Sequence, residues 1–268
     1  MQKFKIITLG CKVNQAESAG IARQLRDRYA AAGADDEPVS LCIINTCTVT
    51  GKASMQSRQA VRQALRAYPN ARIVVTGCYA QTAPDDINSI PGVDLILGND
   101  GKHRIVEEIG RQSADSRELI SGSASPGKDH WIPGSPQEDR ARPFVKIQDG
   151  CNARCSYCIV PTARGASRSL PVENALQSMQ GVAEDGYPEA VLTGIHLGHY
   201  GLDLDPPSDL LTLLKHIRQQ QCIQRVRLSS IEPLELTDDL IRFTAGANDR
   251  PAAICPHFHI PLQSGDND

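Results

Sequence analysis

The sequence lacks any hydrophobic run long enough to span a bilayer, and it also lacks an amino-terminal apolar core of signal-peptide length. After Lys3 and Lys5, the apolar run at residues 6–9 stops at Gly10. We therefore expect a cytoplasmic protein that does not associate with a membrane.

The sequence also lacks a strong charge of either sign. Its 28 Lys and Arg against 31 Asp and Glu give a formal net charge of −3, so the chain as a whole does not attract nucleic acid. Contact with RNA would need a local patch. The acid-free segment between Val39 and Pro84 carries a basic stripe, which fits a phosphate contact or a solvated helix face equally well: Arg58, Arg62 and Arg66.

Apolar and amphipathic segments alternate along the chain in two series. The first predicts strands at residues 5–9, 41–45, 72–76 and 94–97, and helices at 15–32, 53–68, 85–90 and 102–109. The second predicts strands at 144–148, 190–193, 225–229 and 257–262, and helices at 172–184, 209–219 and 237–244. Apolar strands separated by helices are typical of an α/β protein with parallel sheets covered on both faces.

A stretch rich in Ser, Gly, Pro and charge separates the two series and contains the only tryptophan, Trp131. We interpret it as a linker, which gives domains at residues 1–110 and 143–268 and a linker at 111–142. The second series stops after a strand and before a helix could cover it. Because that would expose an apolar edge, we expect a truncated sequence.

The number of cysteines is nine, which is odd and therefore argues against complete disulfide pairing. In a reducing compartment such cysteines indicate metal or redox chemistry. Three of them form a CxxxCxxC set: Cys151, Cys155 and Cys158. Three thiolates in one short loop can hold three irons of a cubane cluster and leave the fourth iron open. Zinc would need a fourth ligand, and neither His196 nor Cys222 lies at a usual spacing.

Three other cysteines each follow an apolar strand of the first series: Cys11, Cys47 and Cys78. The carboxyl ends of parallel strands lie at one edge of a sheet, so we expect these thiols to converge. One alone would be an ordinary buried cysteine, and a redox disulfide would use only two. Together they favour a second iron–sulfur cluster with an open iron. The remaining three are interpreted as structural: Cys42, Cys222 and Cys255.

Seven motifs run through the chain in order: TLGCKVNQAES, INTCTVT, VTGCYAQ, VKIQDGCNARCSYCIVPTARG, LTGIHLGHYG, RLSSIEP and HIPLQSG. They resemble the methylthiotransferase family of radical-SAM enzymes. The resemblance implies an N-terminal Rossmann-like parallel-sheet domain followed by an incomplete radical-SAM (β/α)6 partial barrel. The tRNA-binding TRAM domain that closes such proteins is expected to be absent.

The resemblance also implies the cofactors. The Cys151 set would bind a 4Fe-4S cluster that ligates S-adenosylmethionine (SAM), and the Cys11 set an auxiliary 4Fe-4S cluster. Residues implied in binding SAM are Tyr157, Thr193, Gly194, Ser229, Glu232 and Gln263. Without the resemblance, Ser229 is interpreted as a turn residue and Glu232 as part of an ordinary loop.

The implied activity is transfer of a methylthio group to C2 of N6-threonylcarbamoyladenosine beside the tRNA anticodon, a branch that GCKVNQ favours. The implied partners are tRNA and an electron donor such as flavodoxin or ferredoxin, and we expect a monomer. The alternatives are isopentenyladenosine in tRNA, a ribosomal-protein aspartate, or a non-catalytic metal-binding fragment with one metal site at most.

Two further expectations concern residues near the CxxxCxxC set. His196 and His199 are expected in a glycine-rich loop and not as a metal-binding pair. Arg164 and Arg168 lie just beyond the cysteines and are expected to meet the substrate.

Overall fold

The computed structural model describes residues 2–33, 38–111, 118–120, 131–132, 140–246 and 253–266. It forms two compact units, one of residues 1–132 and 152–166 and the other of residues 133–151 and 167–268. The expected domain limits at 110 and 143 did not anticipate that residues 152–166, with Cys155 and Cys158, group with the first unit. Within the described residues, none of the helices combines the length and the apolar character needed to cross a membrane.

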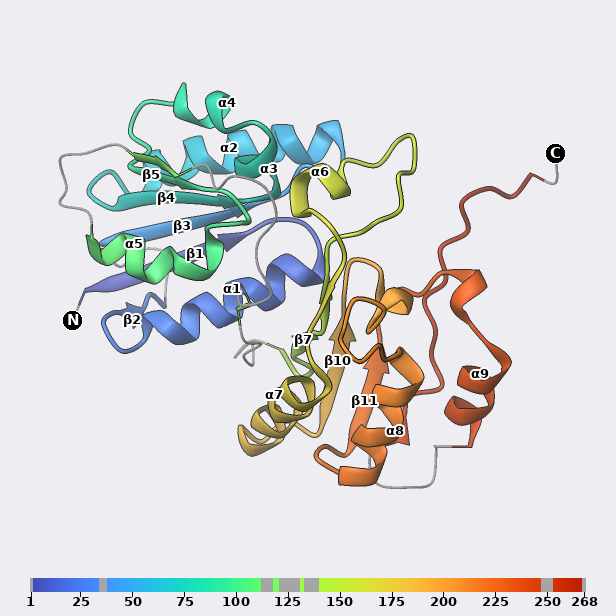
Figure 1. The fold of residues 1–268 in the computed structure, drawn as a ribbon. Coiled ribbons are helices and arrows are strands. Elements are labelled where there is room, and N and C mark those ends of the chain that lie inside the picture. Colours follow the sequence, from blue (N-terminus) through green and yellow to red (C-terminus); the bar gives the residue numbers. More distant parts are fainter. Residues whose placement is uncertain are drawn as a thin grey trace. The chain divides into compact units, whose positions relative to one another are not determined.

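The first unit is built on a six-stranded sheet in which every pairing is parallel. Its order is β2-β1-β3-β4-β5-β6 (Figure 1). The strands are β1 (Lys3–Thr8), β2 (Ala30–Ala31), β3 (Leu41–Thr46), β4 (Arg72–Gly77), β5 (Leu95–Leu97) and β6 (Glu118–Ile120). All six residues of β3 are buried, as expected for a central strand covered on both faces.

Helices cover both faces of this sheet (Figure 1). They are α1 (Lys12–Leu25), α2 (Gly51–Ala67), α3 (Cys78–Thr82), α4 (Pro84–Asn88), the 3-10 turn η1 (Lys102–Arg104) and α5 (Ile105–Arg111). Ile21 of α1 and Ile105 of α5 belong to one apolar cluster. Val61 of α2 and Ile87 of α4 belong to the other. The short helix α6 (Val160–Arg164) completes the unit.

The second unit holds a four-stranded parallel sheet of order β12-β11-β10-β7. Its strands are β7 (Phe144–Lys146), β10 (Glu189–Thr193), β11 (Arg225–Leu228) and β12 (Ala253–Ile254), and β8 (Gln148–Asp149) pairs antiparallel with β9 (Arg168–Ser169). The helices are α7 (Val172–Glu184), α8 (Leu210–Gln220) and α9 (Asp238–Ala245), with 3-10 turns η2 (Leu197–His199) and η3 (Pro233–Glu235). Neighbouring strands joined through one helix each are the repeat of a β/α barrel wall.

The strand predicted at residues 257–262 is wrong. The fourth strand is β12, and after it only an isolated bridge joins Ser230 to His259. Pro256 directly precedes the expected strand and Pro261 lies within it, and each lacks the N–H that a strand inside a sheet would donate.

Two expected elements differ in extent. The first helix ends at Leu25 and not near residue 32, because Ala30 and Ala31 pair with β1 as an edge strand. Here sheet pairing outweighs the helix propensity of alanine. The expected linker contains β6, which pairs with β5. It also contains Ile132, which is buried in the first unit's core.

Candidate functional site

Three thiols lie at the carboxyl edge of the first unit's sheet. Cys47 directly follows β3 and Cys78 directly follows β4, and these strands pair up to Thr46 and Gly77. Cys11 follows β1, the neighbour of β3 on the other side. All three are free thiols, with Cys47 and Cys78 buried and Cys11 partly exposed. The topology thus brings the three thiols to one edge, as their spacing predicted.

Asn14 on α1 ties two of the cysteine-bearing strand ends together. Its side-chain Nδ2 donates hydrogen bonds to the carbonyl of Leu9 at 2.8 Å and to that of Thr46 at 2.9 Å. The side chain of Asn45 in turn donates to the Asn14 carbonyl at 3.0 Å. These buried bonds fix the backbone just before Cys11 and Cys47. In the sequence, Asn14 stood out only as part of a motif.

Two further polar residues hold the cysteines and were missed from the sequence. Ser57 accepts a hydrogen bond from the Cys47 amide at 3.1 Å and donates to the Cys47 carbonyl at 2.8 Å. Asn99 Nδ2 lies 3.5 Å from the Cys78 Sγ. A serine on the apolar face of the expected helix was the available signal for Ser57, because a buried hydroxyl needs a partner.

Two of the cysteine-bearing turns require glycine. Gly10 has a φ of +90°, and a Cβ there would lie 2.6 Å from the Cys47 Sγ. Gly77 has a φ of +100°, and a Cβ there would lie 2.4 Å from the Thr46 carbonyl oxygen. Only glycine combines this backbone conformation with so close an approach.

The electrostatics of this edge suit a bound cluster. Burial raises the pKa of Cys47, and negative charge on Cys78 and Cys11 raises it further. Three thiolates side by side therefore repel one another unless a cation offsets their charge. Soft thiolate ligands are those that iron–sulfur clusters take, so the donor set fits such a group.

Of the second cysteine set, Cys155 and Cys158 belong to the first unit and Cys151 to the second. In the first unit, Cys155 and Cys158 lie in a tight turn in which the Cys158 amide donates to the Cys155 carbonyl at 3.0 Å. Cys155 is exposed and Cys158 partly exposed. Tyr157, a predicted SAM contact, is 76% exposed. These groups are accessible to a cofactor.

In the second unit, Cys151 follows β8 and Gly150. Gln148 shapes this turn, because its side chain donates to the Gly150 carbonyl at 2.9 Å and accepts from the His196 amide at 2.7 Å. The Cys151 Sγ lies 3.4 Å from Nδ1 of His196. A polar ring beside a cysteine sulfur is an arrangement that also occurs around metal centres.

His196 and His199 come together through η2. Their rings are stacked with centroids 3.7 Å apart, and Nε2 of each faces the carboxylate of Glu235. The ligand atoms of these three residues lie within 4.8 Å of one another, a grouping that was not expected from the sequence. Burial lowers the pKa of His199, and positive charge on His196 lowers it further. His196 faces Cys151 with one ring nitrogen and Glu235 with the other, so the group lies directly beside Cys151.

Most predicted SAM contacts lie at the carboxyl ends of the second unit's strands. Thr193 ends β10 and Ser229 follows β11, and both are buried. Ser229 Oγ has no hydrogen-bond partner among the described residues, which suits a hydroxyl that meets a ligand. Gly194 passes so close to Gln148 that a Cβ would lie 2.9 Å from that side chain. Glu232 lies half-buried just before η3.

Gln263 does not lie at a strand end as expected. It lies in an irregular, exposed stretch beyond β12, because the strand predicted at residues 257–262 is not formed. Its role as a SAM contact therefore stays a prediction without support from its position.

The expectation that Arg164 meets the substrate is wrong, because its side chain is only 1% exposed and is bound to Glu17. Arg168 lies 3.2 Å from Asp149 and is less exposed than a free surface cation would be. In the basic stripe, Arg58 donates to the hydroxyl of Tyr79 at 2.6 Å. The other two arginines of the stripe, Arg62 and Arg66, are exposed.

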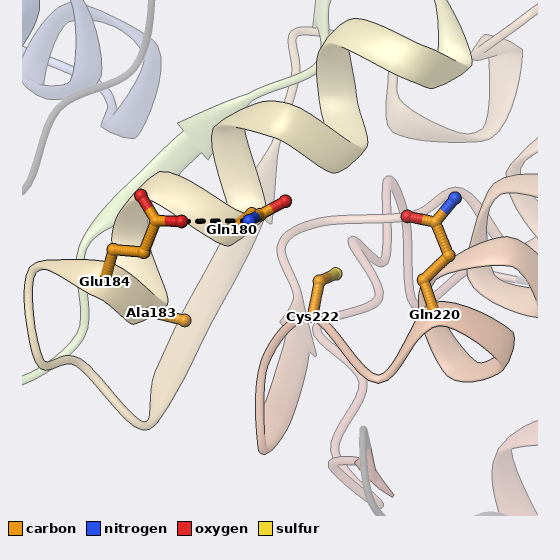
Figure 2. A pocket seen from close by; sticks show the side chains of 5 residues that line it. All are labelled: Gln180, Ala183, Glu184, Gln220 and Cys222. Atoms are coloured by element: carbon orange, nitrogen blue, oxygen red, sulfur yellow. Dashed lines mark hydrogen bonds between the residues drawn. The ribbon is translucent and has the colours of Figure 1, made fainter.

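A surface hollow of about 430 Å³ lies at the amino edge of the second unit's sheet, opposite the edge at which the strands end. Figure 2 shows its lining side chains, which come from the carboxyl ends of α7 and α8 and the turn after α8: Gln180, Ala183, Glu184, Gln220 and Cys222. These helix ends precede β10 and β11, so Cys222 lies at the amino edge of the sheet. Cys151 lies at the carboxyl edge, which argues against Cys222 as a fourth ligand in a zinc site.

Two family models match the chain. Residues 3–98 match the family described as uncharacterized protein family UPF0004, and residues 145–268 match the Radical SAM superfamily. A solved radical S-adenosylmethionine methyltransferase, TsrM from Kitasatospora setae, superimposes with a TM-score of 0.60 at 13% identity. The match covers 97% of this chain and 61% of TsrM, and it shows the fold.

Curated relatives align along nearly the whole chain. The threonylcarbamoyladenosine tRNA methylthiotransferase MtaB of Bacillus subtilis is 38% identical over 265 residues, which is 97% of this chain and 57% of the relative. The MtaB of Thermotoga maritima is 36% identical over 269 residues, 100% of this chain and 60% of its own. The tRNA-2-methylthio-N(6)-dimethylallyladenosine synthase of Clostridium tetani is 30% identical, covering 98% and 58%. The chain thus spans less than two thirds of these relatives' length.

The second unit and the match of residues 145–268 define the class of protein, which is a radical-SAM protein with SAM and a 4Fe-4S cluster as its cofactors. Together with the UPF0004 match and the relatives, this makes the chain similar to radical-SAM methylthiotransferases along nearly its whole length.

Proposed function

We propose that this chain is the cluster- and SAM-binding part of a methylthiotransferase that modifies C2 of N6-threonylcarbamoyladenosine beside the tRNA anticodon. The observation that carries the proposal is the presence of two separate trios of free cysteines. One trio converges at the carboxyl edge of the first sheet, and the other occupies the loop after β8. A single metal-binding module would need only one of them.

The residues proposed to hold an auxiliary 4Fe-4S cluster are Cys11, Cys47 and Cys78. Those proposed to hold the SAM-ligating cluster are Cys151, Cys155 and Cys158. When bound, these cofactors supply one-electron cleavage of SAM and the sulfur that is transferred. The protein provides three thiolates for each, so that one iron of each cubane stays open to another ligand.

The remaining side chains would bind and orient SAM. Thr193, Ser229 and Glu232 follow or close neighbouring strands, so their polar atoms reach the same edge of the second sheet as Cys151. Ser229 offers a hydroxyl and Glu232 a carboxylate, both suited to hydroxyl groups of a ribose. Gly194 leaves room for the backbone to approach Gln148, which shapes the Cys151 turn.

The choice of substrate rests on the relatives. Five MtaB proteins at 33–38% identity are named for threonylcarbamoyladenosine in tRNA. The relative from Clostridium tetani is named for dimethylallyladenosine and is 30% identical, which makes that substrate the second candidate. We further propose a cytoplasmic monomer that receives electrons from a flavodoxin or a ferredoxin.

Iron and sulfide counting after anaerobic reconstitution tests the two-trio proposal. We expect roughly eight irons per chain, because each cubane contributes four. Replacing Cys151, Cys155 and Cys158 with Ala should leave about four irons and abolish 5′-deoxyadenosine formation. Replacing Cys11, Cys47 and Cys78 with Ala should also leave about four irons but preserve SAM cleavage.

The matched control replaces Cys42, which is buried inside β3, with Val and should keep the full iron content. SAM cleavage by the first triple variant, or a wild-type chain with about four irons, would disprove the assignment. Mass spectrometry of tRNA nucleosides from cells lacking the intact gene then distinguishes the two adenosine substrates.

A further inference from the structure

Arg164 is the last residue of α6, in the stretch that follows Cys155 and Cys158. Its side chain is buried, although arginine is rarely buried in proteins unless it has a charged partner. The guanidinium Nη1 lies 3.1 Å from Oε1 of Glu17, and Nη2 lies 3.3 Å from Oε2 of the same carboxylate. This two-pronged contact joins α6 to α1, the helix that starts directly after Cys11.

Glu17 also binds a second buried cation. Lys102 in η1 donates to Oε2 of Glu17 at 2.7 Å and lies 3.2 Å from Oδ1 of Asn45. The side chains of Lys102 and Glu17 are 2% and 4% exposed. Removing one partner from such a buried group leaves the others uncompensated, which is costly.

The same contacts reach residues that hold the cysteines of the sheet edge. Nη2 of Arg164 donates to Oδ1 of Asn14 at 2.5 Å, and Asn14 is the residue that ties the strand ends before Cys11 and Cys47. On the other side, Asn99 donates to the carbonyl of Ala163 at 2.7 Å while its amide faces the Cys78 Sγ. Two neighbouring residues of α6 are therefore bound to the supports of all three cysteines.

We propose that Arg164, through Glu17 and Asn14, is a positioning residue that fixes the Cys155–Cys158 segment against the cysteine-bearing edge of the first sheet. A merely stabilising ion pair could lie anywhere in the core, whereas this one connects the two stretches of the unit that carry proposed cluster ligands. Its importance for catalysis rests on the proposed function. Arg164 would then fix the position of Cys155 and Cys158, where SAM is cleaved, relative to the cysteines at which sulfur is supplied.

Hydrogen exchange on the apoprotein tests the positioning directly. In Arg164→Gln, exchange of the amides at residues 155–164 should rise about tenfold or more, because the segment loses its buried charged contacts. Arg164→Lys keeps the charge but not the planar fork, so it should give a smaller rise. The control Val61→Ala opens a cavity in the core against α2 and should lower the unfolding midpoint without raising exchange in this segment specifically.

The reconstituted protein gives a second readout, the dipolar coupling between the two reduced clusters. In Arg164→Gln we expect a weaker or broader coupling, with SAM cleavage retained and methylthio transfer reduced at least about tenfold. Equal exchange at residues 155–164 in Arg164→Gln and Val61→Ala would overturn the positioning role. A wild-type chain that holds one cluster would instead overturn the proposed function, and the exchange result would still decide the role of Arg164.

Discussion

At the scale of single residues, Gly10 controls the space around Cys47 without being a ligand. In Gly10→Ala, we expect the free energy of unfolding to fall by about 2 kcal/mol or more, because alanine disfavours a positive φ and its Cβ would clash with the Cys47 Sγ. Iron binding at the first trio should weaken in parallel. Denaturant unfolding of the apoprotein and iron counting measure the two effects.

The control for this change is Gly181, which lies inside α7 and where an added Cβ would meet nothing within 4 Å. Gly181→Ala should raise the free energy of unfolding by about 0.5–1 kcal/mol, because alanine is the better helix former. Loss of stability in this variant, or none in Gly10→Ala, would contradict the conformational argument.

The sequence was sufficient to place Cys11, Cys47 and Cys78 at one edge of a sheet, because their position after apolar strands follows from local pattern. It could not identify the residues that hold them. Asn14, Ser57 and Asn99 act on residues 10 to 32 positions away in the sequence. The local signals were weak: Asn14 belongs to a motif, and Ser57 is a serine on an apolar helix face. Arg164 was misjudged for the same reason, since its partner Glu17 is 147 residues away.

At the scale of secondary-structure elements, α8 depends on its first cap. Asp209 accepts a hydrogen bond from the Thr212 amide at 2.6 Å, which satisfies one of the open donors at the helix start. Asp209→Ala should therefore lower the free energy of unfolding by about 1 kcal/mol, measured by urea denaturation. Asp209→Ser keeps a capping oxygen and should retain most of the stability, whereas equal losses in both variants would argue against the cap.

Elements with a clear apolar period were predicted closely, and α7 was predicted with its observed limits. Errors concentrated at short edge strands. β2 and β6 consist of two and three residues, too few to show a period, and they form because a neighbouring strand offers hydrogen bonds. The false strand at residues 257–262 begins with alternating polar and apolar residues, but Pro256 precedes it and Pro261 lies within it.

At the scale of the whole molecule, a buried thiol and a buried phenol should make the free energy of unfolding of the apoprotein fall at alkaline pH. Burial raises the pKa of Cys42 to about 12, against 9.0 for the unperturbed thiol, and burial also raises the pKa of Tyr200. Between pH 9 and about 12 the unfolded chain loses the Cys42 proton while the folded chain keeps it. The stability that this thiol contributes is thus complete below pH 9 and is lost as the pH rises toward 12.

Urea unfolding midpoints of the reduced apoprotein at about pH 8, 10 and 11 should show this loss. Cys42→Val cannot ionise and should lose less, the difference approaching about 1.4 kcal/mol per pH unit within the window. Parallel curves for the two proteins would mean that Cys42 ionises in the folded state.

The two trios of cysteines also differ in the stage of folding at which each could first bind a metal. Cys151, Cys155 and Cys158 are close neighbours along the chain, so a nascent, still unstructured polypeptide already offers them as a chelate. Cys11 and Cys47 lie 36 residues apart, and Cys78 follows 31 residues later. These three, the proposed ligands of the auxiliary cluster, come to one sheet edge only after β1, β3 and β4 have aligned. At this edge, folding should therefore precede metal binding. Metal that binds during synthesis should bind to Cys151, Cys155 and Cys158, because they need only a short loop to come together.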